Sequence, residues 1–410
     1  MIIHFWELPE ERNYIILKEN YNKKIISILE EENYPWKIKN KIKKGKISIK
    51  KLKDIAQKEK ISLDIIEKNI LWIGGNNSKG LSNPKFPINL STRRAARFIA
   101  AIVNDGTLTK NGERNKAYGR LMYDNFDESL RNSVIKDCIA TFGGKAKEIA
   151  FRNTEKKKYL EFSSIMRDMV ELIIKSKGPK CESNIPVPKF ILENNDLIAG
   201  WIEQTIADEG EIKFYPSKYR RAIIWRRSLD VTPLFSGKIK KDTPLRKLPE
   251  SIQGTLEEQK CKLISDEEKM LSHLGIDYII YNLGVYLTEY NKVRTKWQIM
   301  ITKRENLFKL RKIIKIPSKE KDKKFNLITK GFIRFKEPLR IKEIILNISK
   351  NKKPFTSLDL AKKMNYKQLN TAIKWIKIFE KEGLIKKIKE SSYGNGKYRT
   401  PSQYMLIQDK

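Results

Sequence analysis

The sequence is poor in the residues that metal and nucleophile sites use most often. Its 410 residues include two histidines, His4 and His273, which leave little material for a histidine metal site or for a Ser-His or Cys-His nucleophile. The three cysteines, Cys138, Cys181 and Cys261, are far apart and lack CxxC spacing, so they indicate neither a zinc site nor a disulfide framework. Any hydrolytic chemistry in this chain must therefore rest on carboxylates and lysines.

Long apolar runs are missing as well. No stretch reaches the roughly 20 residues that span a membrane, and the basic residues are spread along the chain. The first residues, MIIHFWELPEERNY, do not have the basic start and long apolar stretch of a signal peptide. We therefore expect an intracellular, cytoplasmic protein that does not associate with membranes. A Walker-type glycine-rich loop is also missing, so the sequence does not suggest ATP dependence.

Acidic residues are outnumbered by basic ones. Lys and Arg total 85 against 49 Asp and Glu, which gives a formal net charge of +36 at pH 7. This charge exceeds what solubility needs and favours a polyanionic partner, with nucleic acid as the leading candidate.

Changes of composition divide the chain into several expected units. Residues 1–80 are predicted to form a basic helical domain, because apolar and basic positions alternate at helical spacing between residues 22 and 72. Within it, YPWKIKNKIKKGKISIKKLKDIA has two helical stretches around a Lys-Gly-Lys break, which fits a helix-turn-helix and a plain packing module equally well. The stretch GGNNSKGLSNPKFP then predicts a linker, with a domain boundary near Ser82.

A repeat with a spacing of 104 residues organises the middle of the chain. TRRAARFIAAIVNDG predicts a helix with an acidic end at Asp105, and NDLIAGWIEQTIADEGEI predicts a second helix with an acidic end at Glu209. Strand-like segments, a helix, another strand and a final helix follow in each half. We therefore expect an α+β block of two pseudo-symmetric halves, residues 85–192 and 193–332, whose first helices pack on a pseudo-twofold axis.

These stretches resemble the LAGLIDADG homing endonuclease family in its single-chain, two-repeat form. FIAAIVNDG is similar to the first motif of that family and IEQTIADEG to the second, and the flanks PKFPINLSTRRAARFIAAIVNDGTL, IPVPKFILENNDLIAGW and WQIMITKRENLFKLRKI are similar too. The likeness covers residues 85 to 325. It implies two αββαββα repeats whose strands form a DNA-binding saddle, in a chain that acts as a monomer.

The resemblance also implies a divalent-metal site at the two helix ends. Asp105 and Glu209 are the acidic residues of the two motifs, Gly106 and Gly210 follow them, and these four residues are the expected site for Mg²⁺ or Mn²⁺. Phosphodiester cleavage without histidine calls for such a metal, which prefers oxygen ligands. The glycine after each helix allows a left-handed turn that exposes backbone carbonyls beside the carboxylate. Taken alone, each acid-glycine pair would be an ordinary helix stop.

Members of the family usually have a lysine near the end of each repeat that helps to polarise the attacking water or the phosphate. Lys180 in KGPKCESNIP and Lys324, or its neighbour Lys323, in PSKEKDKKF are the expected counterparts, and a solvated surface lysine is the alternative for each. The sequence predicts that PSKEKDKKF is a charged loop.

The expected helix crossing departs from the family pattern. Ala100 stands where the family often has glycine, and Gln204, at the equivalent position of the second motif, has a long side chain. The stretch IAG, Ile198 to Gly200, one turn before Gln204, can supply the close contact if the two helices cross there.

The strands after each motif are expected to lie in the major groove of DNA, as in the family. Basic residues punctuate both strand ribbons, and the alternative is an edge strand protected by its charge. The expected DNA contacts are Lys110, Arg114, Lys116 and Arg120 in the first half and Lys213, Lys218, Arg220, Arg221, Arg226 and Arg227 in the second.

Residues 336–410 resemble the winged helix-turn-helix family, with three helices and a two-stranded wing. Thr356 or Ser357 can cap the second helix, with Leu358, Leu360 and Ala361 turning inward. LNTAIKWIKIFEKEGLI is the expected recognition helix, with Ile373, Ile376 and Phe379 as its core positions, and YGNGKY is the turn of the wing. The expected DNA contacts are Asn370, Lys374 and Lys377 on that helix and Lys397 and Arg399 on the wing. The same architecture also serves as a protein-binding module.

The sequence therefore predicts a site-specific, metal-dependent endonuclease that acts on double-stranded DNA at the nucleoid. Two alternatives keep the same scaffold: a non-cleaving transcriptional regulator, similar in plan to the WhiA regulators, and an RNA-splicing maturase. Retention of both Asp105 and Glu209 favours the nuclease, whereas the additional winged helix favours regulation.

Overall fold

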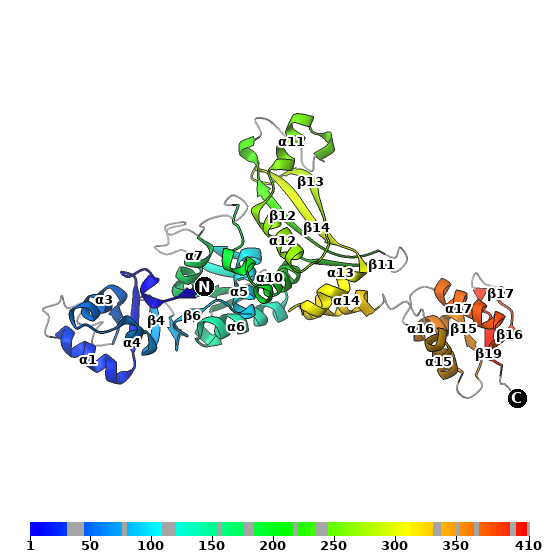
Figure 1. The fold of residues 1–410 in the computed structure, drawn as a ribbon, viewed down its shortest axis with the longest axis horizontal. Coiled ribbons are helices and arrows are strands. Elements are labelled where there is room, and N and C mark those ends of the chain that lie inside the picture. Colours follow the sequence, from blue (N-terminus) through cyan, green and yellow to red (C-terminus); the bar gives the residue numbers. More distant parts are fainter. Residues whose placement is uncertain are drawn as a thin grey trace. The chain divides into compact units, whose positions relative to one another are not determined.

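The computed structural model describes residues 1–30, 45–75, 80–108, 120–148, 150–153, 158–175, 184–215, 220–234, 245–330, 338–349, 353–364, 369–393 and 399–407. The fold is mixed α+β, with several small antiparallel sheets (Figure 1). Contacts group the chain into two compact units. One comprises Met1–Glu211 and Ile223–Asp322, and the other comprises Ile212–Ala222 and Lys323–Lys410.

The first half of the repeat begins with a helix and continues with strands and helices in alternation. Its elements are α5 (Arg93–Asp105), β7 (Gly106–Leu108), β8 (Leu121–Asp124), α6 (Glu128–Phe142), β9 (Ala150–Asn153), β10 (Lys158–Phe162) and α7 (Ser164–Ile174). The four strands form an antiparallel sheet in the order β7-β8-β10-β9.

The second half repeats this order of elements with one additional helix. Its elements are α10 (Asn195–Asp208), β11 (Glu211–Tyr215), β12 (Arg220–Asp230), α11 (Glu250–Glu258), α12 (Lys262–His273), β13 (Ile279–Leu287), β14 (Val293–Ile301) and α13 (Arg304–Ile313). The sheet order is β11-β12-β14-β13, so each strand has the same neighbours as its counterpart in the first half. A short helix, α9 (Lys189–Leu192), precedes α10.

Helices α5 and α10 pack against each other at the centre of this unit (Figure 1). Each begins at a side-chain cap, because Thr92 accepts a hydrogen bond from the amide of Ala95 and Asn194 accepts two from the first turn of α10. The helices come close together at Gly200, where a Cβ atom would lie 2.5 Å from the carbonyl oxygen of Arg93 and 3.3 Å from Ala96 Cβ. The close contact therefore lies one turn before Gln204, as the sequence suggested.

The N-terminal part contains a sheet that the sequence analysis did not anticipate. Strands β2 (Asn13–Leu17), β3 (Ile47–Ser48), β4 (Ile70–Gly75) and β5 (Leu81–Ser82) pair in the order β3-β2-β4-β5, and helices α1 (Glu19–Glu30), α3 (Ile49–Lys58) and α4 (Leu63–Lys68) lie between them in sequence. The expected linker around Ser82 thus includes β5, which is bonded to β4. The first helix of the suggested helix-turn-helix falls in residues 31–44, outside the described part of the chain.

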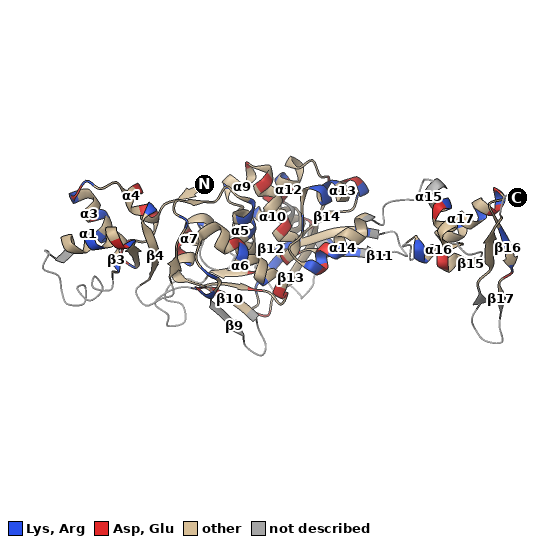
Figure 2. Ribbon diagram, turned by 90° about the horizontal axis from the view of Figure 1, so that it is seen from below, with Lys and Arg blue, Asp and Glu red and all other residues tan. Residues whose placement is uncertain are grey.

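The segment PSKEKDKKF is mostly helical, so its prediction as a charged loop was wrong. Helix α14 (Lys319–Lys330) begins after Ser318, whose hydroxyl accepts from the amide of Lys321, and Phe325 and Ile328 are buried on one of its faces. Acidic residues in the first turn favour this helix start, and Asp322 pairs with Arg311 at 2.5 Å. Figure 2 shows the remaining charged positions along α14.

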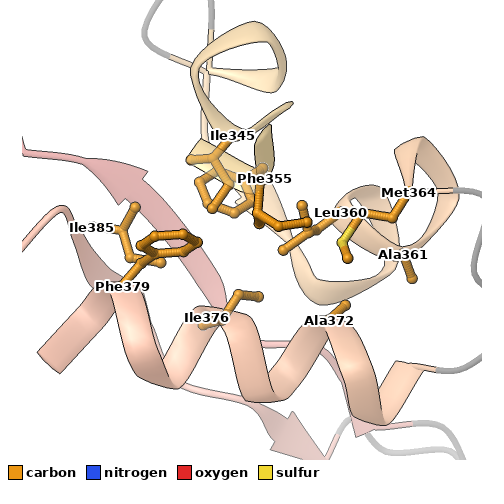
Figure 3. Close-up of a cluster of buried hydrophobic side chains, with 10 residues drawn as sticks. Ile345, Phe355, Leu360, Ala361, Met364, Ala372, Ile376, Phe379 and Ile385 are labelled. Carbon is orange, nitrogen blue, oxygen red and sulfur yellow. The ribbon is translucent and has the colours of Figure 1, made fainter. Parts of the chain in front are cut away.

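The C-terminal residues form a small core of their own (Figure 3). Helices α15 (Pro338–Ile348), α16 (Ser357–Lys363) and α17 (Leu369–Lys381) are followed by β16 (Ile385–Lys389), β17 (Ser392–Tyr393), β18 (Arg399–Thr400) and β19 (Gln403–Leu406), and β15 (Phe355–Thr356) precedes α16. Strands β15, β19 and β16 form one antiparallel sheet, and β17 pairs with β18.

Most of the expected packing of this C-terminal part is present. Thr356 caps α16 in a capping box with Asp359, and Leu360 and Ala361 are buried, as are Ile376 and Phe379 of α17. Ile373 is half-buried. Leu358 was expected to turn inward but is 54 % exposed, because it lies on the opposite side of α16 from Leu360.

Candidate active site at two helix ends

The two central helices both end at an acidic residue followed by glycine. Asp105 is the last residue of α5, whereas α10 ends at Asp208 and Glu209 is its C-cap residue. The glycines are needed for space and not for a left-handed turn, which corrects the sequence-based explanation. Gly106 has an ordinary φ of −83°, and a Cβ atom on it would lie 2.5 Å from the Ile102 carbonyl oxygen. Gly210 meets the equivalent carbonyl of Ile206 in the same way.

Asp208 is held by three side chains. Its two oxygens accept hydrogen bonds from Asn104 Nδ2 at 3.1 Å, from the Tyr123 hydroxyl at 2.8 Å and from Gln204 Nε2 at 2.9 and 3.0 Å. Burial, and after it the charge of Asp105, raise the pKa of Asp208 to about 7. Gln204, whose length was unexpected at a helix crossing, is thus fully buried and serves to hold this carboxylate.

Asp105 has a more open position. Its side chain is half-buried, and Asn125, which follows β8, donates from Nδ2 to Asp105 Oδ2 at 2.8 Å. Asn104, its neighbour in α5, donates to Asp208 at 3.1 Å, so the end of α5 lies beside the end of α10, and the charge of Asp105 raises the pKa of Asp208. Two carboxylates, one from each half, therefore lie close together where the helices end.

Glu209 lies beside a buried guanidinium. Arg227 Nη1 approaches Glu209 Oε1 at 3.4 Å, and Arg227 Nη2 donates to Glu267 Oε1 at 2.6 Å and to Asn104 Oδ1 at 2.8 Å. Burial opposes the charge of Arg227, but Glu267 and Glu209 outweigh it and raise the pKa of the guanidinium. Arg227 is 6 % exposed, so its prediction as a DNA contact was wrong. Consecutive residues of a strand point to opposite faces, and Arg227 points to the core.

A lysine that the sequence analysis did not select reaches the end of α10. Lys321 Nζ donates to the carbonyl oxygens of Ile206, Ala207 and Asp208 at 3.3, 2.6 and 3.2 Å. Burial lowers the pKa of Lys321, and the charges of the neighbouring carboxylates oppose this effect. The expected Lys324 lies on the exposed side of the same helix, α14, as does Lys323. Lys180 lies outside the described residues.

Only some of the residues expected to contact DNA lie in the described part of the chain. Lys110, Arg114, Lys116, Lys218 and Lys397 lie outside the described residues, and Arg220 and Arg399 are placed in strands β12 and β18. Arg120 pairs with Glu161 at 3.4 Å, and Lys213 and Arg221 are half-buried. Arg226 extends from the face of β12 opposite to Arg227 and donates to Gln298 at 2.9 Å. On α17, Asn370, Lys374 and Lys377 are exposed.

Two further features lie in the N-terminal part. His4, Asp64 and Glu67 are a possible metal-binding triad within the described residues. The oxygens of the buried Glu67 already bond to the amide of Phe5 and to His4 Nδ1, so these contacts also anchor the N-terminal segment. A cavity of about 740 Å³ lies between this segment and α7 and is lined by Trp6, Leu8, Arg12, Asp168, Leu172 and Lys175, among others.

Sequence reasoning missed Asn104, Asp208 and Lys321. The first two could have been found from the repeat, because they are 104 residues apart and each stands next to the acidic residue of its motif. Lys321 could not, since the segment around it has lysines at four of seven positions from 318 to 324 and only its fold decides which one turns inward.

Comparisons with known proteins identify no family for this sequence. No protein-family model matches the sequence, and no curated protein matches it. Within the described residues, every helix is too short or too polar to cross a lipid bilayer.

Proposed function

We propose that this protein is a metal-dependent endonuclease of double-stranded DNA, of the LAGLIDADG homing type, that acts as a monomer. The observation that carries the proposal is the meeting of two like helix ends. Asp105, the last residue of α5, and Glu209, the C-cap residue of α10, are 104 residues apart in sequence, and each of these two packed helices continues into a sheet with the same strand order. A pseudo-twofold pair of acidic sites suits a substrate with two antiparallel strands.

The donor set fits a hard divalent cation such as Mg²⁺ or Mn²⁺. The side chains of Asp105 and Glu209 offer carboxylate oxygens, whereas the last carbonyl oxygens of α10 already accept from Lys321. Histidine and cysteine side chains do not contribute, which disfavours zinc. When bound, such a cation would activate a water molecule and neutralise charge on the phosphate. The protein's part is to hold the two carboxylates and to keep Lys321 beside them.

Basic side chains in each of the two compact units support DNA as the substrate. Lys321 places its ammonium group at the negative end of the α10 dipole, where it can also attract a phosphate. Arg226, on the outer face of β12, and the exposed Lys374 and Lys377 of α17 are further phosphate-binding candidates. A net charge of +36 favours binding to DNA by release of counterions.

The test is cleavage of a randomised plasmid library with Mg²⁺ or Mn²⁺. The wild-type protein should cut at a discrete sequence, and the double variant Asp105→Asn, Glu209→Gln should bind the same DNA without cutting it. Uncut DNA that both proteins retain equally would reject the nuclease and favour the second candidate. Cutting by the double variant at the wild-type rate would reject the assignment of the two carboxylates.

The second candidate is a DNA-binding regulator without nuclease activity, with a plan similar to the WhiA regulators. It is favoured by the separate core of the C-terminal part and by the three polar side chains that α17 exposes. The contacts of Asp105 with Asn125 and of Glu209 with Arg227 are compatible with this function as well.

A further inference from the structure

The repeat extends from the helix ends into the neighbouring strands. Asn104 and Asp208 are equivalent positions of the two halves, 104 residues apart. Tyr123 in β8 and Arg227 in β12 are also 104 residues apart, so they are equivalent positions too. Each of these strand residues points into the space between the halves and not to the outer face of its sheet.

Each strand residue bonds to the helix of the opposite half. Tyr123, from the first half, donates its hydroxyl to Asp208 in the second half at 2.8 Å. Arg227, from the second half, donates to Asn104 in the first half at 2.8 Å. Asn104 in turn donates to Asp208 at 3.1 Å, which connects the two contacts into one network. Four residues at two pairs of equivalent positions therefore join the halves next to the candidate metal ligands.

Three of these four residues are buried, so they cannot exchange their partners for water at low cost. Tyr123 is fully buried, Arg227 is 6 % exposed and Asn104 is 8 % exposed. A buried polar group that loses its partner destabilises the fold, because its desolvation is then not compensated. The four residues consequently favour one relative position of the ends of α5 and α10.

The two strand residues of this network, Tyr123 and Arg227, differ in charge. Tyr123 brings a neutral hydroxyl beside Asp208 and Asp105, and the amide of Asn125 holds Asp105. Arg227 brings a positive charge that also contacts Glu209, at 3.4 Å. Glu209 thus contacts Arg227, a member of the network, whereas Asp105 accepts a hydrogen bond from Asn125, which is not one of the four residues.

We propose that Asn104, Tyr123, Asp208 and Arg227 form a cross-half lock, and that Tyr123 and Arg227 are positioning residues for the two cleavage carboxylates. The positioning role rests on the proposed nuclease function. The lock fixes the register of the two helix ends, and Arg227 in addition orients Glu209. Loss of Arg227 should therefore impair cleavage more than loss of the Tyr123 hydroxyl.

The lock itself is tested without reference to cleavage. Thermal unfolding of the full chain is measured for Tyr123→Phe, Asp208→Asn and the double variant. If the two side chains are in direct contact, the shift in Tm of the double variant should differ from the sum of the two single shifts by at least about 2 °C. The control cycle combines Tyr123→Phe with Thr141→Val, which removes another buried hydroxyl of the same half, and should be additive. Additive shifts in both cycles would overturn the lock.

The positioning role is tested with Arg227→Lys, which keeps the charge beside Glu267 but lacks the forked guanidinium that reaches both Asn104 and Glu209. Single-turnover cleavage at saturating DNA should slow by about tenfold or more, while the Kd for DNA stays within about twofold. The control Arg12→Lys weakens another guanidinium contact to a buried carboxylate, Asp168, and should cleave as the wild type does. A merely structural role would lower Tm in both variants and slow neither.

The outcomes separate the two hypotheses. Cleavage by Arg227→Lys at the wild-type rate would overturn the positioning role and leave the nuclease intact. A wild-type protein that cuts no DNA would reject the nuclease and the positioning role together, and the thermal cycle would then still accept or reject the lock.

Discussion

The replacement Gly200→Ala tests the central helix crossing with one added methyl group. The new Cβ would lie 2.5 Å from the carbonyl oxygen of Arg93, a backbone atom that cannot turn aside. Carbon atoms normally approach a neighbour to about 3.5 Å, so the helices would have to separate by several tenths of an ångström or more at this point. Overpacking of this kind costs about 1–3 kcal/mol.

The same replacement at Gly254 provides the matched control. Gly254 lies within α11, and a Cβ added there would have no neighbour within 4 Å. Both variants gain up to about 1 kcal/mol from the higher helix propensity of alanine, so the helix propensity cancels in the comparison. Gly200→Ala should therefore be less stable than Gly254→Ala by about 1–3 kcal/mol, which corresponds to roughly 2–10 °C in Tm.

The assay is thermal unfolding of the full chain followed by circular dichroism, with cleavage or DNA retention measured on the same preparations. A shift of the helix ends should also slow cleavage in Gly200→Ala, because a small misplacement of catalytic groups is costly. If Gly200→Ala is as stable as Gly254→Ala, the helices do not approach closely at Gly200 and the argument for the paired helix ends fails.

Three further predictions follow from the site and the C-terminal part. The pKa of Asp208 is about 7 against an ordinary 3.8, so the folded protein holds this proton more tightly than the unfolded chain does. Protonation of Asp208 therefore adds at most about 4 kcal/mol to the free energy of unfolding. This contribution is complete below about pH 4 and is lost as the pH rises towards 7, so Tm should fall less over this range in Asp208→Asn than in the wild type. Parallel profiles of Tm against pH would contradict this. Lys321→Met should slow cleavage at least tenfold, whereas Lys324→Met, on the exposed side of α14, should not, and equal effects would refute the choice of Lys321. The double variant Lys374→Gln, Lys377→Gln removes two positive charges, so the slope of the logarithm of the DNA-binding constant against the logarithm of salt concentration should become smaller by about 2. An unchanged slope would show that these two lysines of α17 do not contact phosphates.

Parts of the fold could be predicted because they depend on local patterns. The start of α5 at Thr92 and of α10 at Asn194 follows from side-chain caps, and the acid-glycine ends of both helices are visible in the sequence. The buried positions of α16 and α17 follow from their helical spacing, apart from Leu358. The α+β class was predicted correctly for the same reason.

Other parts could not be predicted because they depend on pairing between distant segments. The N-terminal sheet joins β2 to strands about 30 and 60 residues away, and short strands such as β3 and β5 leave little pattern in the sequence. The helix α14 was missed because its charged residues outnumber its buried ones, and burial of Phe325 and the ion pair of Asp322 with Arg311 stabilise it.

The sequence by itself determined that two acidic helix ends recur at a spacing of 104 residues, and its scarcity of histidine and cysteine leaves carboxylates and lysines as the groups for any hydrolytic chemistry. The tertiary structure alone decided which polar side chains meet there. Arg226 and Arg227 are equally basic in sequence, yet strand alternation directs one outward and buries the other beside Glu267 and Glu209. The same holds for Lys321 and Lys324. Burial of Phe325 and Ile328 decides which side of α14 is exposed, so Lys324 faces solvent, whereas Lys321 donates to the carbonyl oxygens at the end of α10.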